Sequence, residues 1–493
     1  MGKSGRQLRI AEPGKHLLQK PYNLYSKVDT ETSRFLDFET WWGSPVLLNA
    51  GEMQWIADNL FVGNKLTSGE IRTSDGVRVD LRNIQSPIVV FCSWGDNITP
   101  PQQALGWITD LYVDEQDIVA NGQTIVYTLH QTIGHLGIFV SGKVATKEHA
   151  EFASCMEMID MLPPGLYEAV ITEVDENTNR PDLIHGKYLF RLEARTTDDI
   201  RALGANSPED DRRFATAARV SEVNLGLYRT VLQPMVRAMT SEQSADLLRE
   251  AHANRLRFAA FSDRNPAMRP VKELAAAVRA DRKPVAPDNP LLVWERVAST
   301  WISTCWENYR LTRDAMTEAS FLATYGSPLL QSLVGLGPGT EATGPDRELV
   351  REANAARRQA DLEKHFDVGG PAEAVIRSIM YVRMPEHAVD ERGFAALQAI
   401  RQVQPANRRL SRSEAKTLLR DQYLLLRSDE ERAIGALPRL LPHDERQREI
   451  GWQAIQDVTM ASGSLSDEGQ RRLQRVGTLF DIKPKSTPGA GHA

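Results

Sequence analysis

Two polar side chains, Asp96 and His135, each follow a short apolar run of the kind that forms a buried strand. Asp96 comes after IVVFCSWG, and His135 comes after TIVYTLHQTIG. Both runs are continuous rather than alternating in hydrophobicity, which is typical of parallel strands covered on both faces. Functional side chains of such sheets lie just past the carboxyl ends of the strands. We therefore expect these two side chains to meet at one edge of a sheet.

An aspartate in contact with a histidine is an arrangement suited to proton transfer. The carboxylate holds the imidazole in one tautomer and stabilises its cationic form. The imidazole can then take a proton from a hydroxyl or a thiol. An acid after one strand and a histidine after the next is the chain order of α/β-hydrolases. We predict that Asp96 and His135 are catalytic residues.

Each residue also has a structural interpretation. A strand-end aspartate often caps the helix that follows, and the NITPP sequence after Asp96 is compatible with such a cap. A histidine between glycines is often a turn residue. The cysteines and serines near the pair are not expected to act as nucleophiles, since buried thiols are usually inert. We predict strand or loop positions for Cys92, Ser93 and Ser141, and core packing on amphipathic helices for Cys155 and Cys305.

The surrounding elements predict an α/β protein with a large helical part. The segment PPQQALGWITDLYV between the two strands is expected to form a helix, with its prolines at the start where a missing N–H matters least. Another helix is expected near residues 144–160, followed by two strands, YEAVITEVD and GKYLFRLEART. From about Asp198 onward, alanine, leucine, arginine and glutamate predominate, which favours helix almost throughout.

We predict five regions along the chain. They are an extended arm (1–30), a partial α/β domain with an aromatic segment (31–197), a helical extension (198–335), a terminal helical bundle (346–482) and a disordered tail (483–493). In the extension, Trp294, Val297 and Trp301 recur at helical spacing. Such a stripe is usually a core or subunit face, and oligomerisation or docking is the second interpretation.

Composition excludes several classes of function. The 493 residues carry a net charge of −6, which gives no general attraction to nucleic acid. The three cysteines form no CxxC pair, so we predict neither a disulfide framework nor a zinc site. We predict no cofactor and no metal. The sequence lacks both a signal peptide and a run of 18 apolar residues, so we predict a cytoplasmic protein without a membrane span.

The region of Asp96 and His135 carries a family resemblance. The segments WWGSPVLLNAGEMQWIADNLFVGNKL, VRVDLRNIQSPIVVFCSWGDNITPPQQALGWI and TIGHLGIFVSG resemble the carboxyl-terminal half of the catalytic domain of poly(3-hydroxyalkanoate) synthases. They look closer still to an uncharacterised bacterial family of synthase-like proteins with a long helical extension. The resemblance implies an α/β-hydrolase fold, Asp96 as the acid, His135 as the base, and a hydroxyacyl thioester or ester substrate. It also implies that Trp41, Trp42 and Trp55 belong to a cap over the site.

One part of that family pattern is missing. The chain contains no G-x-C-x-G or G-x-S-x-G elbow to carry a nucleophile. The first strands of the expected sheet are missing as well. We therefore expect a truncated product, a split subunit or a degenerate relative. A nucleophile-bearing polypeptide or a homo-oligomer is the expected partner.

The last region contains an internal echo. The segment AVIRSIMYVRMPEHAVDERGFAALQAI is loosely repeated by IGWQAIQDVTMASGSLSDEGQRRLQRVGTLF. The pattern resembles the TerB-like helical domain of tellurite-resistance proteins, whose intact acidic loops are suspected of holding a metal. Here Ser462 stands where an acid is expected. We predict that Asp390, Glu391, Asp467 and Glu468 are helix caps and solvated acids.

Two functions of different classes remain open on these grounds. The first is a synthase-like acyltransferase or hydrolase fragment that uses Asp96 and His135. The second is a non-enzymatic helical interaction or stress-response protein, similar to the tellurite-resistance proteins.

Overall fold

The computed structural model describes residues 13–43, 48–62, 64–135, 137, 142–204, 207–283, 285–337, 360, 362–403 and 409–481. The chain divides into two compact units. The first unit combines Met1–Gly63 with Pro208–Ala342, and the second combines Asn64–Ser207 with Thr343–Ala493. Asp96 and His135 both belong to the second unit, so the fold of that unit positions the pair.

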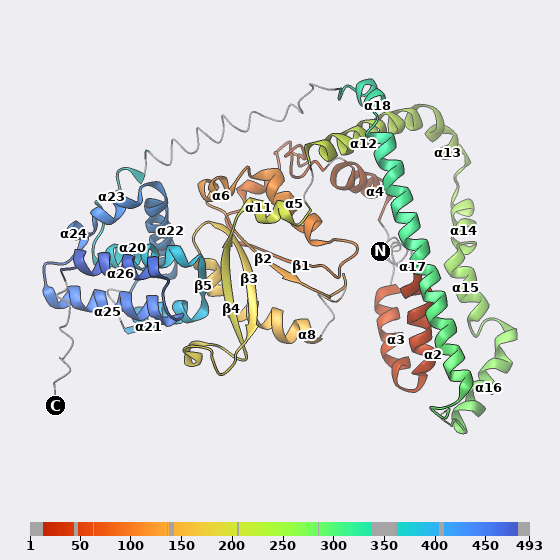
Figure 1. Ribbon diagram of the computed structural model, residues 1–493. Helices are drawn as coiled ribbons and strands as arrows, with labels where there is room; N and C mark the ends of the chain where they lie inside the picture. The colour runs from red at the N-terminus through yellow and green to blue at the C-terminus, as the bar shows by residue number, and fades with distance from the viewer. Residues whose placement is uncertain are drawn as a thin grey trace. The chain divides into compact units, whose positions relative to one another are not determined.

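Within the described residues, the second unit is built on a sheet of five strands in the order β1-β2-β3-β4-β5 (Figure 1). The strands are β1 (Ile88–Ser93), β2 (Thr124–His130), β3 (Gly165–Glu173), β4 (Tyr188–Arg195) and β5 (Ala388–Asp390). Strands β1, β2 and β3 are parallel, whereas β4 and β5 run antiparallel to their neighbours. The chain is therefore a mixed α/β protein, and the two parallel strands predicted before Asp96 and His135 are confirmed.

Helices cover both faces of this sheet. The helices beside the strands are α5 (Pro101–Leu111), α6 (Glu115–Asn121), α8 (Gly142–Val144), α9 (Ala150–Ser154), α10 (Met156–Met161) and α11 (Thr197–Ala202). Buried residues of α5, α6 and α11 pack with Ile125 and Tyr127 of β2 in one cluster. Val126, which points to the other face, packs with residues of α10 and β4. Two-sided burial explains why the strand sequences are continuously apolar.

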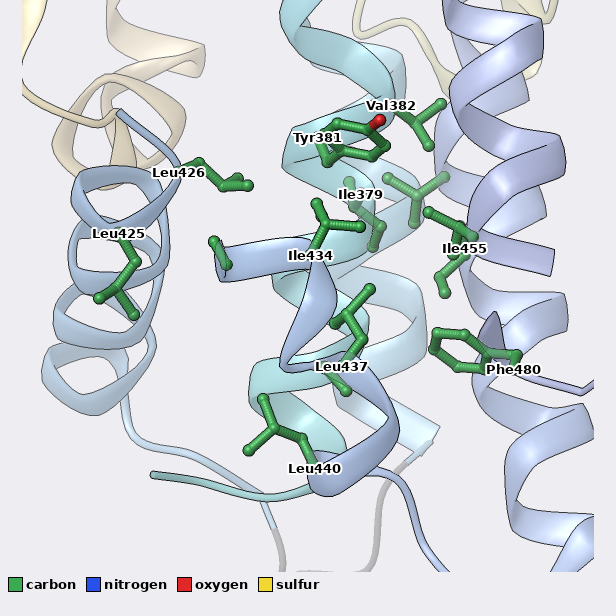
Figure 2. Packing of buried hydrophobic residues seen from close by; sticks show 14 of the residues in the cluster. Ile379, Tyr381, Val382, Leu425, Leu426, Ile434, Leu437, Leu440, Ile455 and Phe480 are labelled. Carbon is green, nitrogen blue, oxygen red and sulfur yellow. The ribbon is translucent and has the colours of Figure 1, made fainter. Parts of the chain in front are cut away.

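The carboxyl-terminal helices pack around a core of their own. They are α20 (Pro371–Arg383), α21 (Glu391–Val403), α22 (Arg412–Ser428), α23 (Glu430–Gly435), α24 (Leu437–Leu440), α25 (Glu445–Ala461) and α26 (Asp467–Leu479). Figure 2 shows side chains from this region converging in the core, among them Ile434, Ile455 and Phe480, which directly follows α26. The same region also contributes β5, which pairs with β4. The edge of the sheet is thus completed by residues almost 200 positions away from β4 along the chain.

Two of the four acids predicted as solvated caps are in fact buried. Asp390 is 3% exposed; it caps α21 by accepting hydrogen bonds from the backbone N–H groups of Arg392 and Gly393. It also accepts from the hydroxyl of Ser462 at 2.8 Å. Glu391 is 5% exposed. The capping role predicted for Asp390 is therefore confirmed, whereas solvation of Asp390 and Glu391 is wrong, because the sheet covers the start of α21.

Glu391 connects α21 to the sheet through its carboxylate. One oxygen accepts from the backbone N–H of Phe190 in β4 at 3.1 Å, and the other accepts from the N–H of His185 at 3.2 Å. At the start of α26, by contrast, Asp467 is exposed and Glu468 pairs with Arg471 and Arg472. The acids of the two echoed segments therefore serve different purposes. The first pair lies against the sheet, and the second pair lies on the helix surface.

The first unit is helical throughout its described part. Its helices are α2 (Lys20–Ser26), α3 (Val28–Gly43), α4 (Ala50–Ile56), α12 (Pro208–Leu227), α13 (Gln233–Met239), α14 (Glu242–Glu250), α15 (Ala253–Phe261), α16 (Arg269–Ala280), α17 (Pro290–Tyr325) and α18 (Pro328–Leu333). On the 36-residue helix α17, Trp294 is 70% exposed and Trp301 is 68% exposed. Cys305 on the same helix is exposed too. The prediction that Cys305 packs in a core is therefore wrong. The stripe of Trp294, Val297 and Trp301 is an exposed surface of α17.

None of the described helices is both long enough and apolar enough to cross a lipid bilayer.

A second buried acid lies close to Glu391. Glu151 of α9 is 6% exposed, and its Oε2 finds no hydrogen-bond partner among the described residues. Burial raises the pKa of the Glu151 carboxyl, and the nearby charge of Glu391 raises it further. Burial also raises the pKa of Glu391. Because the folded state holds these protons more tightly than the unfolded chain, stability falls as pH rises through the raised pKa values.

We expect Glu151→Gln to stabilise the second unit at neutral and alkaline pH. The amide keeps the shape of the side chain and removes a buried charge that lacks a partner. The melting temperature should rise by about 2 °C or more at about pH 8, which corresponds to about 1 kcal/mol, as followed by circular dichroism. The gain should shrink toward about pH 4.5, where the carboxyl of the parent chain is protonated. Glu176→Gln, in an exposed loop, should leave the melting temperature unchanged. An equal gain for Glu151→Gln at both pH values would show that the charge of Glu151 is not the cause.

Candidate functional site

The two predicted residues follow neighbouring strand ends. Strands β1 and β2 are in register so that Ser93, the last residue of β1, pairs with His130, the last residue of β2. Just beyond, the N–H of Trp94 donates to the carbonyl of His130 at 2.9 Å. The two turns that leave the strands therefore start side by side. This geometry follows from parallel pairing, since parallel strands end at the same edge of the sheet.

The structure brings Asp96 and His135 into direct contact. Asp96 Oδ2 lies 2.8 Å from His135 Nδ1. Asp96 is 3% exposed, whereas the His135 side chain is 32% exposed. A buried carboxylate thus faces an imidazole that reaches solvent. This is the arrangement in which an acid orients a histidine and the histidine meets a reactant.

The second oxygen of Asp96 has a separate purpose. Asp96 Oδ1 accepts hydrogen bonds from the backbone N–H groups of Ile98 at 2.8 Å and Thr99 at 3.0 Å. The carboxylate therefore caps its own turn with one oxygen and holds His135 with the other. The expectation that Asp96 caps the following helix is wrong, because the N-cap of α5 is Pro100 and no side chain caps it; the expected contact with His135 is present. The hydrogen bonds to the turn fix the carboxylate in the orientation that the histidine needs.

The contact defines the protonation pattern of the imidazole. A carboxylate oxygen only accepts, so His135 Nδ1 carries the proton in this hydrogen bond. The lone pair of the neutral ring then lies on Nε2. Within the described part of the chain, Nε2 makes no hydrogen bond. In this tautomer, Nε2 is the ring atom that can accept a proton.

Gly95 allows the two turns to come this close. A Cβ added at Gly95 would lie 2.5 Å from the carbonyl carbon and oxygen of Thr132 and 2.8 Å from the carbonyl oxygen of Ile133. These atoms belong to the backbone of the turn that leads to His135. Any side chain at position 95 would push the turns apart. The absence of a side chain is thus a condition for the contact between Asp96 and His135.

The nearest thiol and hydroxyl groups are unsuited to act as nucleophiles. Cys92 is 2% exposed and donates its thiol to the carbonyl of Thr128 at 3.3 Å. Burial raises the pKa of the Cys92 thiol to about 12, so the thiolate is not populated at neutral pH. Ser93 is fully buried, and its oxygen accepts from the N–H of Gly95 at 3.1 Å. Cys155 is buried as predicted, while Ser141 lies outside the described residues.

The aromatic segment belongs to the first unit of the chain. Trp41 is 54% exposed and Trp55 is 48% exposed there, and the side chain of Trp42 lies outside the described residues. A cap role for this segment stays a prediction. Among the described residues, no three His, Cys, Asp or Glu side chains are arranged to hold a metal ion.

Two residues of the site were not anticipated from the sequence. Gly95 matters through its approach to a turn that lies far away in the sequence. His130, the last residue of β2, accepts hydrogen bonds through its ring from the same turn. A second histidine five residues before His135 was visible in TLHQTIGH, but its role depends on the backbone path after the strand.

The fold and the site together define a mixed α/β protein with an acid–histidine pair at the carboxyl ends of two parallel strands. The chain belongs to the family described as a protein of unknown function (DUF3141), whose model matches residues 7–366. It is also similar to a protein of Rhizobium meliloti described as an uncharacterized protein in the ackA 5′ region, with 49% identity over 478 residues. The match covers 95% of this chain but only 64% of that relative. No solved structure matches the chain.

We expect Gly95→Ala to destabilise the second unit by about 1–3 kcal/mol, because the added methyl group must displace backbone rather than a flexible side chain. Chemical denaturation followed by tryptophan fluorescence measures the effect. The matched control is Gly106→Ala on helix α5, where a Cβ meets nothing within 4 Å. That change should be neutral or stabilising, because alanine favours helix. Equal stability of the Gly95 variant and the parent chain would show that the turns are not in contact.

Proposed function

We propose that this chain supplies the acid and the base of an acyl-transfer centre on a partial α/β-hydrolase fold, similar to that of poly(3-hydroxyalkanoate) synthases. The substrate class is a hydroxyacyl thioester or ester. The observation that carries the proposal is the 2.8 Å contact between the buried carboxylate of Asp96 and the partly exposed ring of His135. Its position after two parallel strands supports the proposal, because this is where such folds place reacting groups.

The chemistry assigns one task to each residue. His135 Nε2 takes the proton of a hydroxyl or thiol as the oxygen or sulfur attacks the acyl carbonyl carbon. The ring becomes positively charged, and the carboxylate of Asp96 stabilises it through the Nδ1–H bond. The proton on Nε2 then passes to the leaving thiolate or alkoxide. Transfer of the acyl group to water or to a hydroxyl of another substrate repeats these proton movements.

The nucleophile is proposed to come from another segment. Cys92 and Ser93 are buried and occupied by backbone hydrogen bonds. The chain spans 64% of the length of its Rhizobium meliloti relative, so that protein contains residues with no counterpart here. Strand β1 also lies at the edge of the sheet in the described residues. An edge strand presents unpaired N–H and C=O groups with which a further strand can pair, which is compatible with completion of the sheet by another segment.

The test is hydrolysis of a 3-hydroxybutyryl thioester, followed by release of the free thiol. The purified chain is assayed alone and after mixing with a polypeptide that corresponds to the unmatched part of the Rhizobium meliloti relative. We expect turnover with the mixture. Asp96→Asn and His135→Ala should each lower kcat by about 10²–10⁴-fold, because each removes part of the proton-transfer machinery.

His149→Ala and Asp175→Asn serve as matched controls, since both positions are exposed. Each should leave turnover unchanged. Turnover that persists in the Asp96 and His135 variants would contradict the assignment of acid and base. Absence of turnover from the mixture would contradict the proposed reaction on this substrate.

The exposed face of helix α17 favours a second function, a non-enzymatic helical interaction protein of the stress-response type. Leu291, Trp294, Val297 and Trp301 on this helix are all more than half exposed. Exposed aromatic and aliphatic side chains in such a group are typical of protein interaction surfaces. Self-association through this face would bury the tryptophans that the chain leaves in water.

Sedimentation velocity over a range of concentrations tests this second function. The parent chain should form dimers or larger species as its concentration rises, and Trp294→Ser with Trp301→Ser should remain monomeric at the same concentrations. Glu318→Ser, an exposed polar position on the same helix, should behave as the parent chain does. A monomeric parent chain at every concentration would contradict self-association.

A further inference from the structure

His130 connects the two turns that carry the candidate pair. It is the last residue of β2, and its carbonyl accepts a hydrogen bond from the N–H of Trp94 at 2.9 Å. Trp94 begins the turn that contains Gly95 and Asp96. The backbone of His130 therefore fixes the point at which that turn leaves β1.

The side chain of His130 fixes the other turn. Its Nδ1 accepts hydrogen bonds from the backbone N–H of Thr132 at 3.1 Å and from that of Ile133 at 3.2 Å. Both N–H groups belong to the turn that leads to His135. The carbonyl groups of the same two residues lie against Gly95. One imidazole thus holds the backbone that brings the two turns together.

The surroundings of His130 favour one tautomer. Because Nδ1 accepts, the neutral ring carries its proton on Nε2. Nε2 lies 3.7 Å from Glu148 Oε1, and Glu148 is 6% exposed. Lys147 Nζ lies 3.9 Å from the same carboxylate oxygen. The ring also stacks on Phe91, with 6.5 Å between the ring centroids.

We propose that His130 is a positioning residue for His135. Its Nδ1 holds the turn in the conformation that brings the ring of His135 to the carboxylate of Asp96. Only the catalytic consequence of this role rests on the proposed function. The positioning itself is a property of the fold and can be measured without substrate.

A purely structural role of the ring would have different consequences. If His130 acted only by packing on Phe91, another aromatic ring would replace it. If its acceptor atom is what matters, a smaller side chain with an acceptor at the same place would replace it. Phenylalanine keeps the ring and lacks the acceptor, whereas the side-chain oxygen of asparagine lies close to where Nδ1 of histidine lies.

The experiment compares His130→Phe and His130→Asn in the full chain by proton–nitrogen NMR of the histidine rings. The readout is the signal of the proton on His135 Nδ1, identified by its loss in His135→Ala and its displacement in Asp96→Asn. We expect His130→Asn to keep this signal. In His130→Phe the signal should be lost or averaged with the other tautomer, and the amide protons of Thr132 and Ile133 should exchange at least about tenfold faster.

His130→Gln adds a third variant, since its amide extends past the Nδ1 position and should behave as phenylalanine does. His149→Asn is the matched control, because His149 also contacts the ring of Phe91 but, among the described residues, its side chain caps no helix and holds no turn. An unchanged His135 signal in both His130→Phe and His130→Gln would overturn the proposal. Loss of the signal in His130→Asn with retention in His130→Phe would overturn it as well, in favour of ring packing.

The outcome of this NMR comparison is separable from the outcome of the turnover assay. Where turnover is present, His130→Phe should lower kcat by about 10–100-fold with little change in KM, because a misplaced base slows the chemical step. A lost His135 signal without any turnover in the parent mixture would uphold positioning and reject the reaction. Turnover that is unaffected by His130→Phe, with the signal retained, would reject positioning and leave the reaction standing.

Discussion

The site depends on the close approach of two turns at the end of a pair of parallel strands. Gly95 lies against the carbonyl groups of Thr132 and Ile133, at distances that a Cβ would not allow. This approach places the carboxylate of Asp96 and the ring of His135 in hydrogen-bond contact. Neither side chain could compensate for a wider separation, since both are short. The backbone therefore decides the geometry, and the side chains only complete it.

Burial of Asp96 requires that both of its carboxylate oxygens find hydrogen-bond partners. Asp96 is almost inaccessible, so each of its oxygens is hydrogen-bonded to the protein, one to backbone N–H groups and one to the imidazole. A buried carboxylate that kept an unmet acceptor would be destabilising. Glu151 illustrates that alternative, because its Oε2 has no partner among the described residues and burial raises its pKa. The two acids differ in their hydrogen bonds. Both oxygens of Asp96 have partners, whereas one oxygen of Glu151 has none among the described residues.

The two units of the chain differ in how far their apolar side chains are buried. In the second unit, helices cover both faces of the sheet, and the carboxyl-terminal region contributes both β5 and Glu391, which binds the backbone of β4. The helical bundle and the sheet thus share hydrogen bonds. In the first unit, Trp294 and Trp301 are mostly exposed along α17. Helical periodicity is the same for a buried stripe and for an exposed one, so it identifies a face without saying what covers it.

By itself, the sequence determined the local elements and the identity of the pair. Continuous apolar runs indicated β1 and β2, and the polar residues after them indicated Asp96 and His135, because these signals depend on neighbouring residues alone. Tertiary structure decided what depends on distant backbone. The contact at Gly95, the hydrogen bonds of His130 and the pairing of β5 with β4 all join residues that are separated along the chain. The burial of Asp390 and the exposure of Cys305 belong to the same class, because solvent access is set by what packs above a residue.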